Sequence, residues 1–335
     1  MNNILVVNIN WLGDAVFSTP VFKALKKAYP QARLSCLCAP RVKDVLAYCP
    51  YVDQIIVYDE RGQHRFPWAK WQLIQYLRAQ QFDAAFLLHR SMTRALMVYL
   101  AGIPLRIGFS KTKGLLTHPI DARSEDIHRG DFYLKVLEDY GLKVGDRLCE
   151  LRLKIEDIQS LDMKLSKAGL ASEENYVVLN TGGNWDLKRW PPQAFIALAK
   201  RFNQNFGLKV VFAGADKDRF SCEQMAGAVG SAAIVLCGAT SIGESLALYK
   251  KAVAVISNDS GPLHLAHSVG AAVIGIFGPT RAEITGPRGR GKMQILFKDV
   301  GCNKAPCYHL GCKNNVCMQS VTVDDVLEAF QKIQA

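Results

Sequence analysis

The sequence predicts an α/β protein with two doubly wound domains, each a parallel sheet wrapped by helices. Apolar, β-branched runs alternate with segments of helical periodicity through most of the chain. This alternation stops in a charged stretch around residues 155–175 and then restarts, and 335 residues suffice for two domains of ordinary size. We therefore expect a first domain over residues 1–165, a second over 172–320 and a closing helix within 321–335.

The first half contains five expected strands, and helical periodicity begins after the first of them, at Asp14. A glycine turn and Asp14 thus follow the first strand, at the edge where parallel sheets bind ligands. Asp14 suits two roles equally well, the N-cap of the following helix or a catalytic carboxylate. The strands are ILVVNIN, RLSCLC, QIIVY, AAFLL and RIGF, and further helices are expected at about residues 42–48, 68–78, 92–101 and 131–140.

The loop after the third strand, ERGQHRFPWAK, mixes basic and aromatic side chains. It contains Arg61, His64 and Arg65 beside Phe66 and Trp68. Such a loop is usually a solvated connection, but its composition also suits a phosphorylated sugar.

The second half repeats the pattern, and small or hydroxyl residues follow its strands. The strands are YVVLN, KVVFAG, AIVLC, AVAVIS and AVIGIF, separated by helices. Two α/β halves imply a cleft, and small residues at strand ends leave room for a ligand and offer main-chain donors to it. These residues are Thr181, Gly182, Gly183 and Asn184 after the first strand, Gly214 to Asp216 after the second, Gly238 to Ser241 after the third, and Asn258 to Gly261 after the fourth.

Charged residues near these strand ends have both a ligand role and a structural one. Lys188 stands just before a helix start, where a cation would bind a diphosphate, although a single lysine is more often a surface residue. Asp216 and Asp218 could hold a ribose hydroxyl or cap the next helix.

The segment NDSGPLHLAHSVGAAVIGIFGPT, residues 258–280, has the features of an anion-binding helix N-terminus. Asp259, Ser260 and Gly261 follow an apolar strand and precede a proline-started helix that carries His264 and His267. Exposed amides and the positive end of the helix dipole suit a phosphate-bearing ligand. Asp-Ser-Gly is also an ordinary helix cap.

Composition and missing motifs exclude several classes of protein. With 49% apolar and 21% charged residues, the chain is neither disordered nor membrane-like. No apolar run approaches the roughly 18 residues of a spanning helix, and the N-terminus lacks the features of a signal peptide. We therefore expect a cytoplasmic protein, with contact to a membrane face left open. Neither a P-loop nor G-x-G-x-x-G follows the first strand, and no G-x-S-x-G is present, which weighs against kinases, NTPases, dinucleotide oxidoreductases and serine hydrolases.

A net charge of +11 favours an anionic partner. Nucleic acid, a phospholipid surface and a phosphorylated small molecule all remain open on charge alone. The chain lacks the clustered basic helix or aromatic repeat that would favour nucleic acid.

Three segments together resemble the motifs of glycosyltransferase family 9, the ADP-heptose:lipopolysaccharide heptosyltransferases. They are GDAVFSTPVFKALKKAYP near the start, GGNWDLKRWP in the middle and residues 258–280, and they occur in order over nearly the whole chain. The resemblance implies a GT-B fold, with two Rossmann-like domains facing each other across a cleft. It also implies inverting transfer from a nucleotide sugar with no required cofactor, and a terminal helix that packs back on the first domain.

The resemblance also implies roles for individual residues. Asp14 falls on the family's catalytic base, Lys188 on its donor-phosphate lysine, and Asp259, Ser260, Gly261 and His264 on its diphosphate motif. Thr240 and Ser241 match the adenine pocket, and Asp218 the ribose-binding acid. Two departures stand out: Asn8 replaces a basic residue of many relatives, and Asn184 replaces a hydroxyl residue of some.

Cys302, Cys307, Cys312 and Cys317 recur every five residues near the C-terminus. Four thiols in so short a segment could hold zinc or an iron–sulfur cluster, although this is not a zinc-knuckle spacing. We therefore expect a structural loop that binds metal or forms disulfides on oxidation.

The leading hypothesis is an inverting enzyme that moves heptose from ADP-L-glycero-D-manno-heptose to the inner core of lipopolysaccharide at the inner face of the inner membrane. Two alternatives are a family 9 enzyme that uses another nucleotide sugar for a surface glycan and, in a different class, a non-catalytic nucleotide- or nucleic-acid-binding protein. The basic residues expected to face a phosphorylated acceptor are Arg61, Arg65, Arg123 and Arg129.

Overall fold

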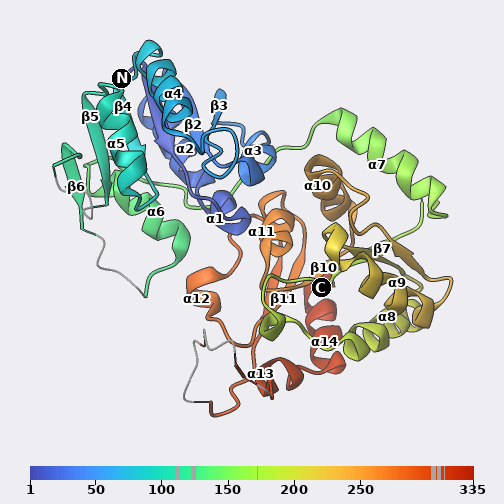
Figure 1. Cartoon of the computed structure of the whole chain (residues 1–335). Coiled ribbons are helices and arrows are strands. Elements are labelled where there is room, and N and C mark those ends of the chain that lie inside the picture. Colours follow the sequence, from blue (N-terminus) through green and yellow to red (C-terminus); the bar gives the residue numbers. More distant parts are fainter. Residues whose placement is uncertain (110–113, 122–125, 172, 303–306, 308–310, 313) are drawn as a thin grey trace. The chain divides into compact units, whose positions relative to one another are not determined.

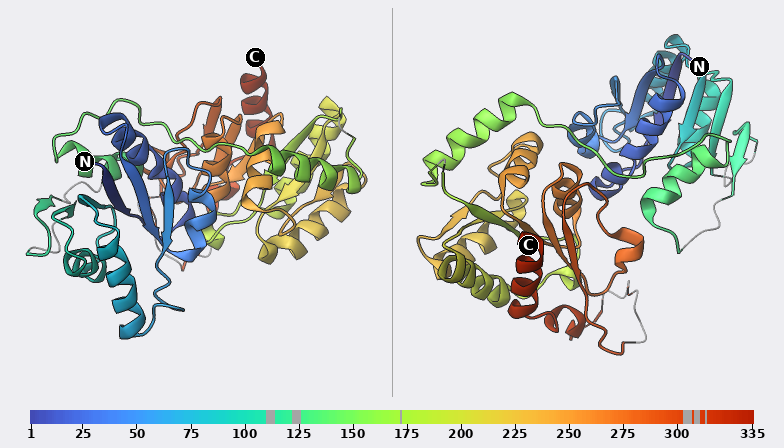
Figure 2. Two further views of the ribbon diagram at one scale, coloured as in Figure 1. Left: turned by 90° about the horizontal axis from the view of Figure 1, so that it is seen from above. Right: turned by 180° about the vertical axis from the view of Figure 1, so that it is seen from behind.

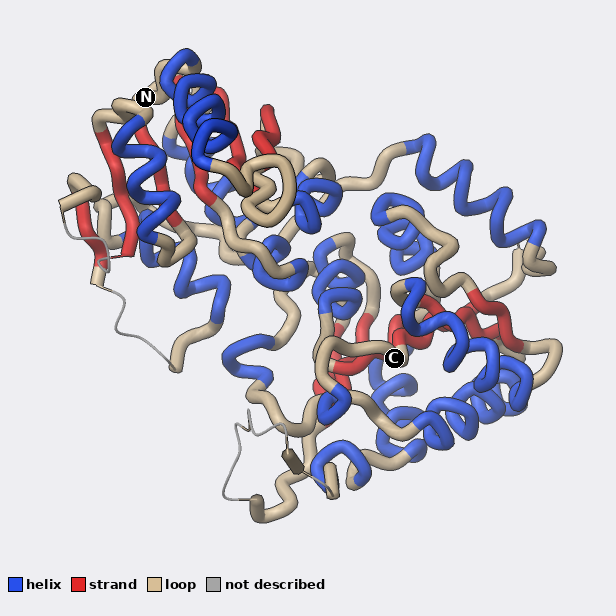
Figure 3. The backbone as a smooth tube through the Cα atoms, in the orientation of Figure 1, coloured by secondary structure: helices blue, strands red, loops and turns tan. Residues whose placement is uncertain are grey.

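The protein consists of two compact α/β units, Met1–Arg152 and Leu153–Ala335. The computed structural model describes residues 1–109, 114–121, 126–171, 173–302, 307, 311–312 and 314–335. Each unit contains a six-stranded sheet in which all strand pairs are parallel, with helices on both faces (Figures 1 and 3). The predicted α/β class with two doubly wound parallel sheets is confirmed.

The first unit has the strand order β3-β2-β1-β4-β5-β6. Connections on the two sides of β1 run over opposite faces: α2 and α6 pack on one face, and α4 and α5 lie side by side on the other (Figures 1 and 2). The strands are β1 (Asn3–Val7), β2 (Arg33–Cys38), β3 (Gln54–Val57), β4 (Ala84–Leu87), β5 (Leu105–Phe109) and β6 (His118–Ile120). The helices are α1 (Leu12–Phe17), α2 (Thr19–Ala28), α3 (Pro40–Leu46), α4 (Pro67–Ala79), α5 (Met92–Leu100) and α6 (Arg129–Glu138).

The second unit has the strand order β12-β11-β10-β7-β8-β9. Helices α8, α9 and α14 share a buried core with one face of this sheet, whereas α7, α10 and α11 form a second packed group. The strands are β7 (Tyr176–Asn180), β8 (Lys209–Ala213), β9 (Ala233–Val235), β10 (Val255–Asn258), β11 (Val273–Ile276) and β12 (Met293–Leu296). The α-helices are α7 (Ile155–Lys167), α8 (Pro192–Phe206), α9 (Arg219–Val229), α10 (Ile242–Lys251), α11 (Gly261–Ser268), α12 (Ala282–Thr285), α13 (Val316–Gln319) and α14 (Val323–Gln334), with 3-10 turns η2 (Asp186–Lys188) and η3 (Asp216–Asp218).

The division between the units lies earlier than the predicted junction. The charged segment expected to join the domains is largely helix α7, which packs on α10 of the second unit. The buried Glu244 of α10 accepts hydrogen bonds from Ser160 and Lys164 of α7, at 2.6 and 2.7 Å. These partners lie some 80 residues away in the sequence, so local composition gave no sign of them.

The terminal helix also differs from expectation. We expected it on the first domain, but α14 packs on α8, β11 and β12 of its own unit. Its Phe330 ring lies 5.0 and 5.1 Å from the rings of Phe202 and Phe206, and Val326 and Ile333 join the same core. An apolar stripe on an amphipathic helix identifies the buried face but not the surface that covers it.

Candidate functional site

Asp14 lies within α1, just after the carboxyl end of β1. It is the third residue of the helix, and the N-cap position is held by Trp11, so the expected capping role of Asp14 is wrong. A carboxylate in the first turn is nevertheless stabilised by the amides and the dipole of the helix. Its side chain is partly exposed, as a group that meets a ligand must be.

Tyr133 of α6 holds this carboxylate. Its hydroxyl donates a hydrogen bond of 2.7 Å to Asp14 Oδ1. Burial, and then the negative charge of Asp14, raise the pKa of Tyr133 well above the usual tyrosine value. Tyr133 therefore stays protonated near neutral pH and serves as a permanent donor that orients Asp14.

The turn between β1 and α1 is braced from inside the first unit. The buried Arg94 guanidinium donates to the Asn8 main-chain oxygen at 2.8 Å and to Asn10 Oδ1 at 2.7 Å. Asn8 is fully buried, and its amide donates to the Ser18 hydroxyl at 2.9 Å. Asn8, singled out in the sequence as a lost basic contact, thus has a structural role, and the buried cation next to this turn comes from α5.

The four basic residues proposed for an acceptor have different placements. Arg61 and Arg65 are exposed in the loop before α4, where the Arg65 guanidinium lies 5.9 Å from the Phe66 ring. Arg129 is exposed at the start of α6. It is close enough to Tyr133 for its positive charge to offset part of the rise in the pKa of that hydroxyl. Arg123 lies outside the described residues.

In the second unit, Asp259 is the centre of a buried polar cluster. Lys188 Nζ lies 2.6 Å from Asp259 Oδ2, and the Thr280 hydroxyl donates to the same oxygen at 2.6 Å. The Thr285 hydroxyl approaches this oxygen at 3.5 Å, and His264 Nε2 lies 3.9 Å from Oδ1. The Asp259 side chain is only 4% exposed and that of Lys188 20%, so the ammonium group is the more accessible part of the pair.

Helix α11 begins beside this cluster without a side-chain cap. Ser260 occupies the N-cap position, but its hydroxyl makes no capping bond; it lies 3.2 Å from the Ser257 hydroxyl. The interpretation of Asp-Ser-Gly as an ordinary cap is therefore wrong. The positive end of the helix dipole next to Lys188 suits this position to an anion.

Asn258 ties the neighbouring loops to this end of the sheet. Its amide donates to the main-chain oxygens of Thr181 and Gly182 at 2.9 and 3.2 Å, and its Oδ1 accepts from the Trp190 amide at 3.0 Å. The loop that carries Lys188 is thereby fixed to β10. Asn258 was seen in the sequence only as a strand end, since nothing local signals three long-range contacts.

Other predicted ligand residues after β7 contact the protein instead. The Thr181 hydroxyl lies 3.4 Å from the Cys222 sulfur, and Asn184 Oδ1 accepts from Lys217 Nζ at 3.4 Å. A Cβ at Gly182 would lie 2.5 Å from Asp218 Oδ2, so a larger residue there would displace the buried Asp218 side chain. These side chains shape the loop, whereas Gly183 has more room for a neighbour.

Asp218 is buried and occupies the N-cap position of α9, as the structural alternative predicted, but its side chain makes no capping hydrogen bond. Arg189 Nη2 lies 3.8 Å from Asp218 Oδ1 and donates to the Gly183 oxygen at 2.8 Å. Asp216 is exposed and pairs with Arg219 at 3.0 Å. Asp218 therefore lies in space against the loop that follows β7, at Gly182 and Arg189.

Thr240 and Ser241 form the start of α10. Ser241 is the N-cap in a capping box: its hydroxyl accepts from the Glu244 amide at 3.1 Å, and Glu244 Oε2 accepts from the Ser241 amide at 2.7 Å. Thr240 and Ser245 hydroxyls lie 2.8 Å apart. The Ser241 side chain thus has a structural task that the sequence analysis overlooked, although the S-x-x-E signature was present.

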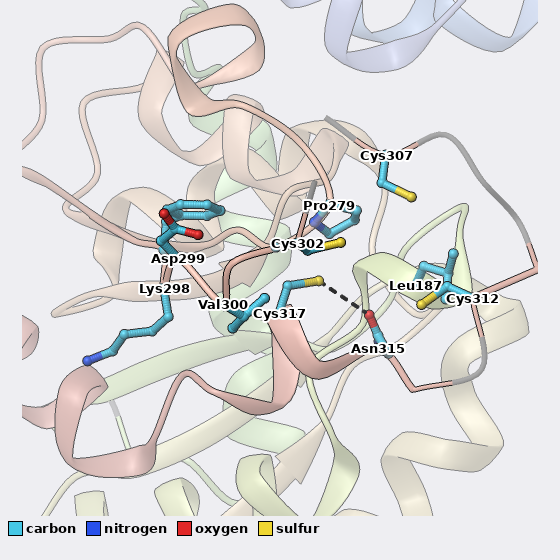
Figure 4. A pocket seen from close by; sticks show the side chains of 12 residues that line it. Leu187, Pro279, Lys298, Asp299, Val300, Cys302, Cys307, Cys312, Asn315 and Cys317 are labelled. Atoms are coloured by element: carbon cyan, nitrogen blue, oxygen red, sulfur yellow. Dashed lines mark hydrogen bonds between the residues drawn. The ribbon is translucent and has the colours of Figure 1, made fainter. Parts of the chain in front are cut away.

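Cys302, Cys307, Cys312 and Cys317 line one small pocket of ≈ 50 Å³ (Figure 4). Cys317 Sγ donates to Asn315 Oδ1 at 3.8 Å (Figure 4). Burial raises the pKa of Cys317, which opposes thiolate formation. Among the described residues, no three His, Cys, Asp or Glu side chains are grouped to hold a metal ion.

Comparison with known proteins identifies the family. The family model for glycosyltransferase family 9 (heptosyltransferase) matches residues 70–317. The chain belongs to glycosyltransferase family 9. It is therefore a glycosyltransferase, and the resemblance carried by the three segments is confirmed.

Relatives in this family match the chain over nearly its full length. Lipopolysaccharide heptosyltransferase 2 of Salmonella typhimurium is 27% identical over 322 residues, which cover 90% of this chain and 89% of the relative. The structure of E. coli ADP-heptose lps heptosyltransferase II has a TM-score of 0.83 at 23% identity and covers 99% of this chain and 98% of its own. A family 9 glycosyl transferase from Veillonella parvula has a TM-score of 0.86 at 21% identity, with coverage of 99% and 97%. The shared fold of two Rossmann-like units is GT-B.

Within the described ranges, none of the helices combines the length and apolar character needed to cross a bilayer.

The sequence analysis missed several residues of these clusters. Tyr133, Arg94 and Thr285 lie in segments without any motif, so only their neighbours in space reveal them. Thr280 could have been identified from the sequence, because it ends the 258–280 segment and lies in the turn four residues after β11.

Proposed function

We propose that this glycosyltransferase moves heptose from ADP-L-glycero-D-manno-heptose to the inner core of lipopolysaccharide, with inversion at the anomeric carbon. The observation that carries this proposal is the Lys188–Asp259 pair at the start of α11, in a family 9 chain whose relatives are named heptosyltransferases. A buried carboxylate that fixes an accessible ammonium group beside a helix N-terminus is suited to a diphosphate.

In the proposed reaction, Asp14 is the general base. It removes the proton of an acceptor hydroxyl while that oxygen forms a bond to the anomeric carbon of the donor. The bond from this carbon to the diphosphate oxygen breaks, and its electron pair leaves on ADP. Lys188 and the amides at the start of α11 stabilise the charge of the departing diphosphate, which is the usual task of preorganised donors. Tyr133 supports the base through its hydrogen bond to Asp14.

The remaining predicted residues have supporting roles in this proposal. Asp218 binds the donor ribose and the turn at Thr240 and Ser241 lies against the adenine, while His264 and Gly183 belong to the diphosphate surroundings. Arg61, Arg65 and Arg129, together with Arg123, attract a phosphorylated, lipid-linked acceptor. We further propose that the enzyme works as a peripheral protein at the cytoplasmic face of the inner membrane.

A transfer assay tests the donor and the acceptor. The purified chain is incubated with ADP-heptose and lipopolysaccharide acceptors that carry no heptose or one heptose, and products are read by mass. Addition of one heptose to either acceptor supports the proposal and assigns the position. Transfer only from another nucleotide sugar, with ADP-heptose inert, would replace the proposal by the alternative of a different surface glycan.

The assignment of the base is tested by Asp14→Asn. This variant should bind ADP with unchanged affinity, measured by calorimetry, and lose transfer by a factor of about 100 or more. Asp44→Asn, an exposed acid on α3 of the same unit, is the matched control and should retain turnover. Retained turnover in Asp14→Asn would refute its role as base.

A further inference from the structure

Helices α4 and α5 have large apolar side chains on both their buried and their exposed sides. Leu73 and Leu77 of α4 and Met97 of α5 are buried in the core of the first unit. On the opposite sides, Phe66, Trp68, Trp71, Met92, Leu96 and Tyr99 are exposed; we call these six the α4–α5 surface. They make up six of the 15 large exposed hydrophobic side chains among the described residues. A surface helix of a soluble protein normally has a polar outer side, so this concentration needs a partner to explain it.

The two helices that carry the α4–α5 surface are neighbours. They cover the same face of the first sheet and pack on each other (Figures 1 and 2). Arg78 Nη2 at the end of α4 donates to the Leu100 oxygen at the end of α5, at 2.7 Å. The rings of Phe66 and Trp68 stack with their centres 4.4 Å apart and their planes at 5°. This part of the surface is therefore preorganised before a partner binds.

One end of this surface lies at the ligand edge of the first sheet. Helices α4 and α5 follow the parallel strands β3 and β4, so their first residues lie near the carboxyl ends of those strands. Trp68 and Met92 stand in the first turns of the two helices. The same edge carries Asp14, in the first turn of α1, the helix that follows β1.

The surroundings of this surface are strongly basic. Residues 61–101 contain six Lys and Arg, of which Arg94 is buried, and one acid, Asp83. The Asp83 carboxylate, just before β4, already accepts hydrogen bonds from the main-chain amides of Asn2 and Asn3. Asp59 in the preceding loop is bound by the amides of Gly62 and Gln63, which leaves Glu60 as the nearby exposed acid.

Cations also lie over the aromatic rings of the α4–α5 surface. The guanidinium of Arg65 lies 5.9 Å from the Phe66 ring, and that of Arg106 lies 5.3 Å from the Tyr99 ring. Apolar side chains bordered by Lys and Arg match a layer of acyl chains below anionic headgroups, and tryptophan and tyrosine prefer that boundary. A second copy of this chain would bring like charges together, and Met92 and Leu96 offer nothing to a nucleic acid.

We propose that the α4–α5 surface binds an anionic phospholipid membrane. Trp68 and Trp71 insert at the headgroup boundary, and Arg65 and Lys70 contact lipid phosphates. This deepens the proposed function by naming the surface that meets the membrane, since a lipid-linked acceptor would be presented at the same edge of the sheet. Its test uses vesicles alone, so its failure is distinguishable from failure of heptose transfer to a detergent-solubilised acceptor.

Vesicle sedimentation of the full chain tests the proposal. The protein should bind vesicles of phosphatidylcholine with about one third phosphatidylglycerol, and bind pure phosphatidylcholine at least tenfold more weakly. Trp68→Ser/Trp71→Ser should lower the affinity for anionic vesicles at least tenfold, and Lys70→Gln about fivefold, as each basic residue near a charged surface contributes. Met163→Ser/Phe220→Ser removes two exposed apolar side chains from helices of the second unit and should bind like the wild type.

Fluorescence adds a readout of depth. Brominated acyl chains should quench tryptophan emission of the wild type, and Trp68→Phe/Trp71→Phe should still bind but lose most of that quenching. The proposal is overturned if the wild type binds neither vesicle, if the serine double variant binds like the wild type, or if the control loses as much affinity. It is also overturned if Trp68→Ser/Trp71→Ser instead abolishes self-association or oligonucleotide binding in a protein without vesicle affinity.

Discussion

The hydroxyl of Tyr133 donates a hydrogen bond of 2.7 Å to Asp14 Oδ1, across 119 residues of sequence. Tyr133 is buried, and its raised pKa keeps the proton on the phenol. The Tyr133 hydroxyl thus holds the proposed base in one orientation. Because it keeps its own proton, Tyr133 does not take the proton that leaves the substrate hydroxyl.

Tyr133→Phe should therefore impair turnover without impairing donor binding. We expect kcat to fall about tenfold, since loss of orientation misplaces the carboxylate, while the affinity for ADP stays unchanged. The lost hydrogen bond stabilised the ionised carboxylate, so the acidic limb of the pH–kcat profile should move to higher pH. A purely structural role predicts a lower melting temperature with an unmoved pH profile, and that result would contradict positioning. Tyr140→Phe, two residues after the end of α6, is the control.

Two variants can separate the contribution of the Lys188–Asp259 pair to stability from its contribution to ligand binding. Lys188→Met leaves a carboxylate of 4% exposure without its cation, which should cost about 3–5 kcal/mol in the free energy of unfolding. Lys188→Met/Asp259→Asn removes both charges and should recover most of that loss. Urea unfolding measures both values.

Affinity for ADP gives the second half of this comparison. If Lys188 contacts the diphosphate, ADP binding should stay weak in the double variant although stability returns. Recovery of ADP affinity together with stability would mean that Lys188 only neutralises Asp259.

Thr280 and Thr285 should contribute unequally to the Asp259 cluster. The Thr280 hydroxyl lies 2.6 Å from Asp259 Oδ2 and is buried, whereas that of Thr285 lies at 3.5 Å. Thr280→Val should destabilise the protein by about 1.5–3 kcal/mol, the usual contribution of a hydrogen bond to a charged group. Thr285→Val is the matched variant and should cost clearly less; equal losses would contradict the geometry.

His89 predicts a loss of stability in mild acid. Burial, and then the charge of Arg94, lower its pKa to about 4. Unfolded histidine titrates near 6.5, so between pH 6.5 and 4 the unfolded chain takes up a proton that the folded chain does not, and the free energy of unfolding falls. His89→Gln should reduce this decrease by about 1–3 kcal/mol.

Urea unfolding at pH 7 and pH 4.5 measures that effect, with the exposed His118→Gln as the control. The two variants should behave alike at pH 7 and differ at pH 4.5. An identical pH dependence in His89→Gln and the wild type would show that His89 is not the group responsible.

Phe330→Ala tests the placement of α14. Removing a ring that packs on Phe202 and Phe206 should cost about 3–5 kcal/mol. Amide exchange should become faster in α8 and β12 and stay unchanged in α4 and α5, whereas the exposed neighbour Gln331→Ala should change neither. Faster exchange in the first unit instead would favour the original expectation for this helix.

The sequence by itself determined the fold class, most elements and the family. Continuous apolar runs between helical segments predict parallel strands, because both faces of such a sheet are covered. The helix expected at about residues 92–101 is α5, Met92–Leu100. Short motifs around Asp14, Lys188 and Asp259 were visible because a strand end, a turn and a helix start follow one another locally. The short β6 and the partly buried β12 were missed, because so few residues give little apolar pattern.

Only the tertiary structure decided which of these residues meet. Tyr133 and Asp14, or Lys188 and Asp259, lie 119 and 71 residues apart, and no local propensity encodes such distances. The same holds for α7 and α14, whose apolar stripes predict burial but not the partner that buries them. Contacts of this kind arise when the sheet brings strand ends together. Only the folded structure shows that Asp14 is not a helix cap, that Ser241 is one, and that Asn8 braces a turn.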